Sequence, residues 1–373
     1  MRVAVVDLPA YTPPYDRSLC HALARAGAEV TLLTSRFVHG EVPPADGYRV
    51  REAFYRRSAS ATGQARRGLR AAEHLASLAT LRGEVAPFDL VHYQWLTFPA
   101  LDAWLLPPAR PRVLTPHGWL RAEGDVARGA AGFRRLARKM DLVVALSEWG
   151  ARRLRDDLGV DPRRVEVVPH GAFDYLTRLP DEAPLPPYLE AVDRPVVLCF
   201  GLIRHYKGID LLIQAFRDVP DAELWVVGRP LGTAIEPLRR LAAPIRERVR
   251  IEPRFVAERE VPAFFRRAEL VVLPYRDAEQ SGVLFTALAF GKAIVVTDVG
   301  GFSEVAAAGG ARAVPAGDPA ALAATINALL ADAAARRGLE EGARAAASGR
   351  YSWDEAARRM LALYRALLDG RGG

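Results

Sequence analysis

Short apolar runs alternate with segments of helical spacing along the chain, which is the pattern of an α/β protein. The first two runs, Val3 to Val6 and Glu29 to Thr34, flank a helical segment from Arg17 to Ala26. A strand, a helix and a strand in about thirty residues form a parallel crossover unit. Later strands are expected at Leu90 to Tyr93, Val113 to Thr115, Leu142 to Leu146 and Val165 to Val168, with a helix from Trp149 to Leu158. The first half is therefore predicted to be one doubly wound sheet.

The second half repeats this alternation after a proline-rich segment, 181–195, in which neither a helix nor a central strand is favoured. We place the linker there, which gives domains at 1–185 and 186–350. Asp318 and Pro319 begin a later helix, and a final helix of residues 351–373 opens at Ser352. Strands are expected at Val196 to Phe200, Leu224 to Val227, Val249 to Ile251, Leu270 to Leu273 and Ala293 to Thr297.

The strand from Val196 to Phe200 ends on Gly201 and leads into a loop that carries Arg204 and Lys207. Ligands of open α/β sheets lie beyond the carboxyl ends of the strands, so this loop lies where a ligand would bind. An arginine guanidinium and a lysine ammonium both bind phosphate oxygens well, so a pyrophosphate group is the expected ligand. The alternative is a solvated loop with two surface cations. The chain contains 51 Lys and Arg residues, of which only Lys139, Lys207 and Lys292 are lysines, and this favours a specific role for Lys207.

A second motif, Glu279 to Gly301, follows the strand that closes at Tyr275. Gln280, Ser281 and Gly282 open a helix whose unpaired N–H groups and dipole form a ready anion site. The Glu279 carboxylate cannot serve phosphates because like charges repel, and it suits sugar hydroxyls instead.

His117 lies between Pro116 and Gly118 at a predicted strand end. From the residues alone, a structural role is the commoner one for such a histidine. His170 has a similar Pro-His-Gly setting, and His205 is expected to be solvated.

The composition of the chain limits the class of protein, its partners and its expected location. The 373 residues, 50% apolar and 25% charged, describe a globular protein of two ordinary domains. The net charge of +7 is shared by both halves, with no signature of a nucleic-acid module, so no nucleic-acid partner is expected. Cys20 and Cys199 read as buried thiols of a reducing compartment. Asp7 and Pro9 interrupt any secretory signal, and the apolar region from Trp95 to Leu106 is too short to span a bilayer, so a cytoplasmic location is expected.

A run of arginines separates two predicted elements of the first half and contains a single acidic residue, Glu52. Such a run is usually a solvated face or loop. The alternative is contact with anionic lipid headgroups, which would make the protein peripheral at the inner face of a membrane. The seven residues are Arg49, Arg51, Arg56, Arg57, Arg66, Arg67 and Arg70.

Taken together, these motifs resemble those of retaining glycosyltransferases with the GT-B fold, the large family typified by sucrose synthase and bacterial mannosyltransferases. The resemblance covers essentially the whole chain. It rests on GLIRHYKG, on EQSG with the following FGKAIVVTDVGG, on TPHG and VVPHG, and on the final YSWDEAARRM.

The resemblance implies two Rossmann-like domains facing a cleft, with the last helix crossing back to the first domain. It assigns catalytic roles to His117, Arg204, Lys207 and Glu279, with His117 near the transferred sugar. It also implies front-side substitution without a protein nucleophile. The donor-binding residues would be Gly201, Arg204, Lys207, Arg254, Glu279, Gln280, Ser281, Gly282, Val283 and Thr286.

Two departures from the family pattern stand out. The acidic motif of the family carries a second glutamate that holds the donor ribose, but this chain has Thr286 or Ala287 there, depending on the register. The family also often has a paired-glycine loop after its first strand, where this chain has YTPPYD. We predict Tyr15 and Asp16 as acceptor contacts in its place.

The predicted function is retaining transfer of a sugar from a nucleotide-diphosphate sugar to a glycan or lipid-linked acceptor hydroxyl, in glycan, polysaccharide or glycolipid biosynthesis. No cofactor is implied, and no metal site is predicted because the chain lacks an Asp-x-Asp motif. Two alternatives remain open: a sugar-nucleotide epimerase or phosphorylase of the same architecture, and a non-catalytic nucleotide-sugar binder.

Overall fold

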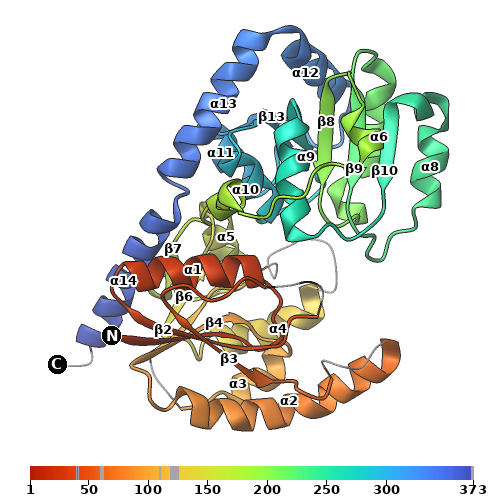
Figure 1. The fold of residues 1–373 in the computed structure, drawn as a ribbon. Coiled ribbons are helices and arrows are strands. Elements are labelled where there is room, and N and C mark those ends of the chain that lie inside the picture. Colours follow the sequence, from red (N-terminus) through yellow and green to blue (C-terminus); the bar gives the residue numbers. More distant parts are fainter. Residues whose placement is uncertain (39, 41, 59–62, 109–110, 118–125, 371–373) are drawn as a thin grey trace. The chain divides into compact units, whose positions relative to one another are not determined.

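The computed structural model describes residues 1–38, 40, 42–58, 63–108, 111–117 and 126–370. The chain divides into two compact units, each with its own parallel sheet (Figure 1). The first unit is Met1–Gly171 together with Trp353–Gly373, and the second is Ala172–Ser352.

The first unit contains a parallel sheet of seven strands in its described part, in the order β3-β2-β1-β4-β5-β6-β7. Most strand residues are buried, because helices cover both faces of a doubly wound parallel sheet. The strands are β1 (Arg2–Asp7), β2 (Glu29–Ser35), β3 (Arg49–Phe54), β4 (Leu90–Trp95), β5 (Arg112–Leu114), β6 (Leu142–Ala145) and β7 (Val165–Val167).

The strand β3 was not predicted. It lies at the edge of the sheet, and its first four residues are exposed, so its sequence RVREAF lacks the apolar run of a central strand. The other strands of this unit lie where the apolar pattern placed them.

Helices cover both faces of the first sheet: Figure 1 shows α1 and α14 on one side and α2 and α3 on the other. The helices are α1 (Pro13–Arg25), α2 (Gly63–Val85), α3 (Pro99–Leu105), α4 (Val126–Ala137), α5 (Glu148–Arg152) and α14 (Trp353–Asp369). Within the described ranges, no helix is both long and apolar enough to cross a membrane.

The second unit has a parallel sheet of six described strands in the order β10-β9-β8-β11-β12-β13. They are β8 (Val196–Phe200), β9 (Glu223–Val227), β10 (Val249–Glu252), β11 (Leu270–Leu273), β12 (Ala293–Thr297) and β13 (Arg312–Val314). Its helices are α6 (Pro187–Glu190), α7 (Ile209–Ala215), α8 (Glu236–Ala242), α9 (Val261–Arg267), α10 (Gly282–Ala289), α11 (Phe302–Ala307), α12 (Pro319–Ala331) and α13 (Ala333–Ser348). The predicted Asp318 cap is confirmed, since its carboxylate accepts from the amide of Ala321 at 2.9 Å.

The boundary between the units falls at Gly171, before the expected linker at 181–195. That proline-rich segment belongs to the second unit, where the guanidinium of Arg267 donates to the carbonyls of Val192 and Arg194 at 2.6 and 2.8 Å. The prolines disfavour long elements, but they do not indicate which unit a segment packs against.

The last helix, α14, belongs to the first unit and packs beside α1 (Figure 1). Its Tyr364 is fully buried, and the hydroxyl group lies 2.5 Å from Nδ1 of His92 on β4. One buried hydrogen bond therefore joins the end of the chain to the central part of the first sheet.

We expect Tyr364→Phe to lower the free energy of unfolding by about 1–3 kcal/mol, because His92 would lose a buried partner. Urea denaturation measures this change. Tyr351→Phe is the matched control, since the buried Tyr351 hydroxyl has no hydrogen-bond partner in the described part of the chain. Equal losses for the two variants would contradict the prediction.

Candidate functional site

In the second unit, Lys207 and the start of α10 both lie close to Gly201, the first residue of the loop after β8. Gly201 has φ +97°, which favours glycine, and a Cβ built there would lie 3.0 Å from Lys207 Nζ and 2.9 Å from Val283 Cγ2. The missing side chain therefore leaves the Lys207 ammonium and the first turn of α10 close together. This confirms that the two sequence motifs meet at one place.

Lys207 is a buried cation, with 6% of the residue exposed. Its Nζ atom lies 5.0 Å from the ring centre of Tyr275, within the range of a cation–π contact. The Tyr275 hydroxyl lies 3.1 Å from Oγ of Ser281. A single aromatic residue thus contacts both the lysine and the residue that opens α10.

The first turn of α10 keeps two amides available for an anion. The carbonyl of Ser281 accepts from the amides of Leu284 and Phe285 at 2.9 and 3.3 Å. The amides of Gly282 and Val283 donate to no acceptor in the described part of the chain. Two free N–H groups at the positive end of the helix dipole are suited to phosphate oxygens.

Two arginines lie on adjacent loops of this site. The backbone amide of Ile203 donates to the carbonyl of Arg229 at 2.9 Å, which places Arg229 beside the segment that carries Arg204. In each arginine the Nε atom is buried and lacks a hydrogen-bond partner among the described residues. Sequence reasoning found Arg204 and missed Arg229, although Arg229 follows the end of β9 and the signal was therefore present.

Glu279 lies in the segment that connects β11 to α10 and is buried, with 3% of the residue exposed. Its carbonyl accepts from the amide of Gly301 at 3.2 Å. This hydrogen bond joins the first and last residues of the predicted acidic motif. Gln280, the next predicted donor contact, lies so close to Gly301 that a Cβ on that glycine would meet its side-chain amide at 2.5 Å. The close backbone approach explains the paired glycines at the end of the motif.

Arg254, predicted as a donor contact, forms an ion pair with Glu260 at 2.8 Å. Burial tends to raise the pKa of Glu260, but the hydrogen bond and charge of Arg254 outweigh it and lower this pKa below the usual value. The structure thus engages Arg254 within its own unit, and its role toward the donor stays a prediction.

Neither residue at the expected second-glutamate position offers a carboxylate. The Thr286 hydroxyl donates to the carbonyl of Gly282 at 2.8 Å, a bond within its own helix. Ala287 is fully buried in the core.

His117, from the first unit, is held in a chain of hydrogen bonds. Its Nε2 atom lies 3.0 Å from the Gln94 side-chain oxygen, and the Gln94 nitrogen lies 3.2 Å from Nε2 of His92. Burial lowers the pKa of His117 to about 3, so its imidazole is neutral near pH 7. Gln94 and His92 were not predicted as partners of His117, because their alternating positions in β4 indicate only a strand. Gly118, the last residue of the predicted motif, lies outside the described residues.

The predicted acceptor contacts Tyr15 and Asp16 are both buried, with 4% and 1% exposed. The Tyr15 ring meets His117 edge to face, with centroids 4.5 Å apart. Asp16 shares a hydrogen bond with Asp7, and burial raises the pKa of both carboxyl groups. Their role toward an acceptor stays a prediction.

The arginine run does not form one uniform face. Arg49 pairs with Glu29 at 3.2 Å and Arg51 with Glu84 at 2.9 Å. Arg70 donates to the carbonyl of Pro9 at 2.9 Å. The side chains of Arg66 and Arg67 lie outside the described part of the chain.

Two α/β units, each built on a doubly wound parallel sheet, are the architecture of the GT-B class of glycosyltransferases. The family model for glycosyl transferases group 1 matches residues 194–332, and that for glycosyltransferase family 4 matches residues 16–172. The chain belongs to this glycosyltransferase family and is an enzyme of that class.

Relatives named D-inositol 3-phosphate glycosyltransferase include the following two. The protein of Xylanimonas cellulosilytica is 32% identical over 383 residues, covering 94% of this chain and 90% of the relative. The protein of Kineococcus radiotolerans is 30% identical over 404 residues, covering 96% and 90%.

Solved structures share the fold at lower identity. Sucrose-phosphate synthase from Thermosynechococcus elongatus has a TM-score of 0.76 at 20% identity, covering 99% of this chain and 100% of that one. HepE from Anabaena, solved in complex with UDP, has a TM-score of 0.72 at 19% identity, covering 98% and 100%.

The buried histidines predict how stability depends on pH. Burial lowers the pKa of His117 to about 3 and that of His170 to about 4, from an ordinary value of 6.5. Below pH 6.5 the unfolded chain binds protons that the native state does not, so stability falls as the pH is lowered from 6.5 toward 4. Each such histidine contributes about 1.4 kcal/mol per pH unit in that window.

His170→Gln should therefore flatten this slope by about 1 kcal/mol per pH unit on average between pH 7 and 5, measured by urea denaturation. The raised pKa values of Asp7 and Asp16 act in the opposite direction, but they are common to both proteins. An unchanged slope in the variant would show that His170 already binds its proton in the folded state.

Proposed function

We propose that this glycosyltransferase moves a sugar from a nucleoside diphosphate sugar to an acceptor hydroxyl, with retention at the anomeric carbon. The observation that carries the proposal is the meeting of the Lys207 ammonium with the first turn of α10 over Gly201. A lysine, arginines and free helix amides around one glycine suit a diphosphate better than any uncharged ligand.

The chemistry follows from where charge develops. When the bond between the sugar and the diphosphate breaks, negative charge grows on the leaving oxygen, and preorganised donors lower the barrier. Lys207, Arg204 and the amides of Gly282 and Val283 supply such donors, and Arg229 is a further candidate from the adjacent loop. This protein-borne charge supports the proposal that the reaction needs no metal ion.

The sugar itself would be held by groups that accept or donate hydrogen bonds. The Glu279 carboxylate suits sugar hydroxyls, because it lies beside the phosphate donors without being able to bind phosphate. We assign His117 to the transferred sugar, as the family resemblance implies. Its imidazole is neutral and is oriented through Gln94.

The donor and acceptor classes take support from the related proteins. HepE has been solved with UDP and with UDP-glucose, so uridine diphosphate sugars are the first donors to test. The relatives named for D-inositol 3-phosphate suggest a small phosphorylated acceptor. Glycan or glycolipid biosynthesis at a cytoplasmic membrane face remains the wider expectation.

The test is turnover of nucleoside diphosphate sugars, with the anomeric configuration of the product read by NMR and the assay repeated with EDTA. Transfer with retention and without metal dependence is expected. Inversion would overturn the proposed stereochemistry. Sugar isomerisation without an acceptor would instead favour an epimerase, an activity named for a structural neighbour from Listeria monocytogenes.

Lys207→Ala should lower kcat by roughly two to three orders of magnitude, because one preorganised transition-state donor is lost. Lys139→Ala is the matched control, since Lys139 is an exposed lysine of the other unit. Circular dichroism establishes that both variants are folded. Near-normal turnover in a folded Lys207→Ala protein would remove the phosphate assignment.

The missing second carboxylate makes a separate prediction about the donor ribose. A charged hydrogen bond contributes roughly 1.5–3 kcal/mol, but the Thr286 hydroxyl is neutral and donates within its own helix. Removing the 2'-hydroxyl of the donor should therefore lower kcat/KM by about tenfold or less. The comparison of ribo and 2'-deoxyribo donors measures this ratio, and a penalty of several hundredfold would reveal another residue in the lost role.

A further inference from the structure

Arg276 lies in the loop after β11 and contacts the loop that carries Lys207. Its backbone amide donates to the carbonyl of Tyr206 at 2.7 Å, and its Nη1 atom donates to the carbonyl of His205 at 3.0 Å. Both carbonyls lie between the predicted donor residues Arg204 and Lys207. One residue of the loop after β11 therefore holds the backbone of the loop after β8 at two successive positions.

The Arg276 guanidinium is itself fixed by an ion pair with Asp210, in the first turn of α7. Its Nη1 and Nη2 atoms donate to the two carboxylate oxygens at 2.8 and 2.7 Å, which is the paired geometry that a planar guanidinium favours. The two side chains are only 25% and 32% exposed. Burial tends to raise the pKa of Asp210, but the hydrogen bond and charge of Arg276 outweigh it and lower this pKa below the usual value. Asp210 therefore stays ionised near pH 7 and keeps Arg276 in place.

Close backbone packing at Gly208 joins the same two loops. Gly208 has φ +63°, and a Cβ built there would lie 2.0 Å from the carbonyl oxygen of Pro274, so a larger residue would have to move the loop. The two loops begin side by side, because β8 and β11 are neighbours in the sheet. The backbone is thus held on both sides of Lys207, at Tyr206 and at Gly208.

We propose that Arg276 is a positioning residue of the donor site, which holds the loop after β8 so that the Lys207 ammonium stays at the first turn of α10. The proposal rests on the function proposed above. The Lys207 Nζ atom lies 5.0 Å from the ring centre of Tyr275, the residue before Arg276, so a shift of either loop would move the ammonium away from its contact. A displacement of about 1 Å is enough to remove much of the effect of a preorganised group. Arg276 is itself engaged by Asp210 and by backbone carbonyls, so it acts through Lys207.

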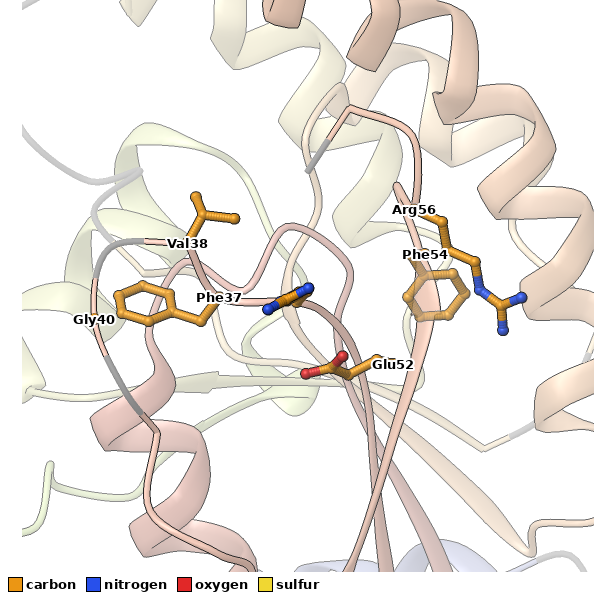
Figure 2. Close-up of a pocket in the computed structure, with 7 residues that line it drawn as sticks. Phe37, Val38, Gly40, Glu52, Phe54 and Arg56 are labelled. Atoms are coloured by element: carbon orange, nitrogen blue, oxygen red, sulfur yellow. The ribbon is translucent and has the colours of Figure 1, made fainter. Parts of the chain in front are cut away.

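Charged side chains also gather in the first unit, in the pocket that Figure 2 shows. Arg56 lines this pocket beyond the end of β3 and is exposed. In the sheet order, β3 lies four strands away from β5, which precedes His117. These charges are therefore distant in the sheet from the predicted site residue of their unit, whereas Arg276 directly follows Tyr275, which Lys207 contacts.

The first experiment measures kcat of Arg276→Ala with the nucleoside diphosphate sugar that the unmodified enzyme turns over. We expect kcat to fall by about tenfold to a hundredfold, with a smaller change in KM, because the charge that Lys207 meets develops only as the donor breaks. In a Lys207→Ala background the same substitution should cost far less, since the positioned group is already gone. An equal loss in both backgrounds would overturn the proposal, because Arg276 would then act independently of Lys207.

Arg276→Lys separates position from charge. A lysine keeps the positive charge, but it cannot pair with both oxygens of Asp210 while it also reaches the carbonyl of His205. We therefore expect kcat to stay low in this variant, and full activity with lysine would contradict the positioning role. Asp210→Asn breaks the same ion pair from its other side and should also lower kcat, which keeps the test available if Arg276→Ala does not fold.

Arg250→Ala is the matched control. Arg250 pairs with both oxygens of Glu223 at 2.8 and 3.2 Å, near the beginnings of β9 and β10 and thus at the opposite end of the strands from the candidate site. Urea denaturation should show a loss of stability in both variants, whereas kcat of the folded enzyme should fall only in Arg276→Ala. A comparable loss of kcat in Arg250→Ala would mean that any broken ion pair of this unit has the effect, and the positioning role would be wrong.

Binding of a free nucleoside diphosphate tests the same contacts without turnover, because it carries the charge that develops on the leaving group. UDP, GDP and ADP are titrated by calorimetry, and the one that binds most tightly is used. Arg276→Ala should weaken its binding by roughly fivefold to fiftyfold, and by much less in the Lys207→Ala background.

The binding and turnover results together separate this proposal from the proposed function. If the two substitutions are coupled in diphosphate binding but no sugar is transferred, the positioning role stands and the transferase proposal falls. If sugar is transferred but Arg276→Ala changes neither kcat nor diphosphate affinity, the transferase proposal stands and the positioning role falls.

Discussion

The described strands of both sheets pair in parallel, and this pairing decides where polar side chains can gather. Strands that pair in parallel must each be followed by a crossover, and helices on both faces of the sheet leave only the strand ends for polar chemistry. The candidate donor site of the second unit obeys this rule. Gly201 directly follows β8, and Arg229 lies in the loop after β9.

Much of the fold could be predicted because buried strands consist of short runs of apolar residues. The run from Val196 to Phe200 and the glycine after it predicted both a central strand and the loop that we propose binds the diphosphate. The edge strand Arg49–Phe54 was not predicted, since its first four residues are exposed and its arginine-rich sequence is typical of a loop. The division at Gly171 was not predicted either. It depends on which unit a segment packs against, and the local sequence pattern does not show this.

The candidate site was predictable where chemistry follows a strand end and hidden where it depends on side-chain partners. Arg204, Lys207 and Glu279 were predicted from their placement, and the structure brings Lys207 to the first turn of α10, while their roles toward a donor stay predictions. Gln94 and His92 could not be, because a polar residue inside a strand reveals nothing of the hydrogen bond it makes across the sheet. The buried hydrogen bonds that link Tyr55 to His74 and His74 to Asp102 were hidden for the same reason, because the three residues come from a loop and two helices.

The discontinuity of the first unit has a consequence for synthesis on the ribosome. The hydrogen bond between His92 and Tyr364 joins residues 272 positions apart, and the second unit lies between them. The second unit is a contiguous segment that can fold as soon as it has been translated, whereas the first must wait for α14 to emerge. Until then the apolar side chains that α14 covers, beside α1, stay uncovered. The earliest-made part of this enzyme is thus the last to be finished, and until α14 has been translated its uncovered apolar surface is open to association.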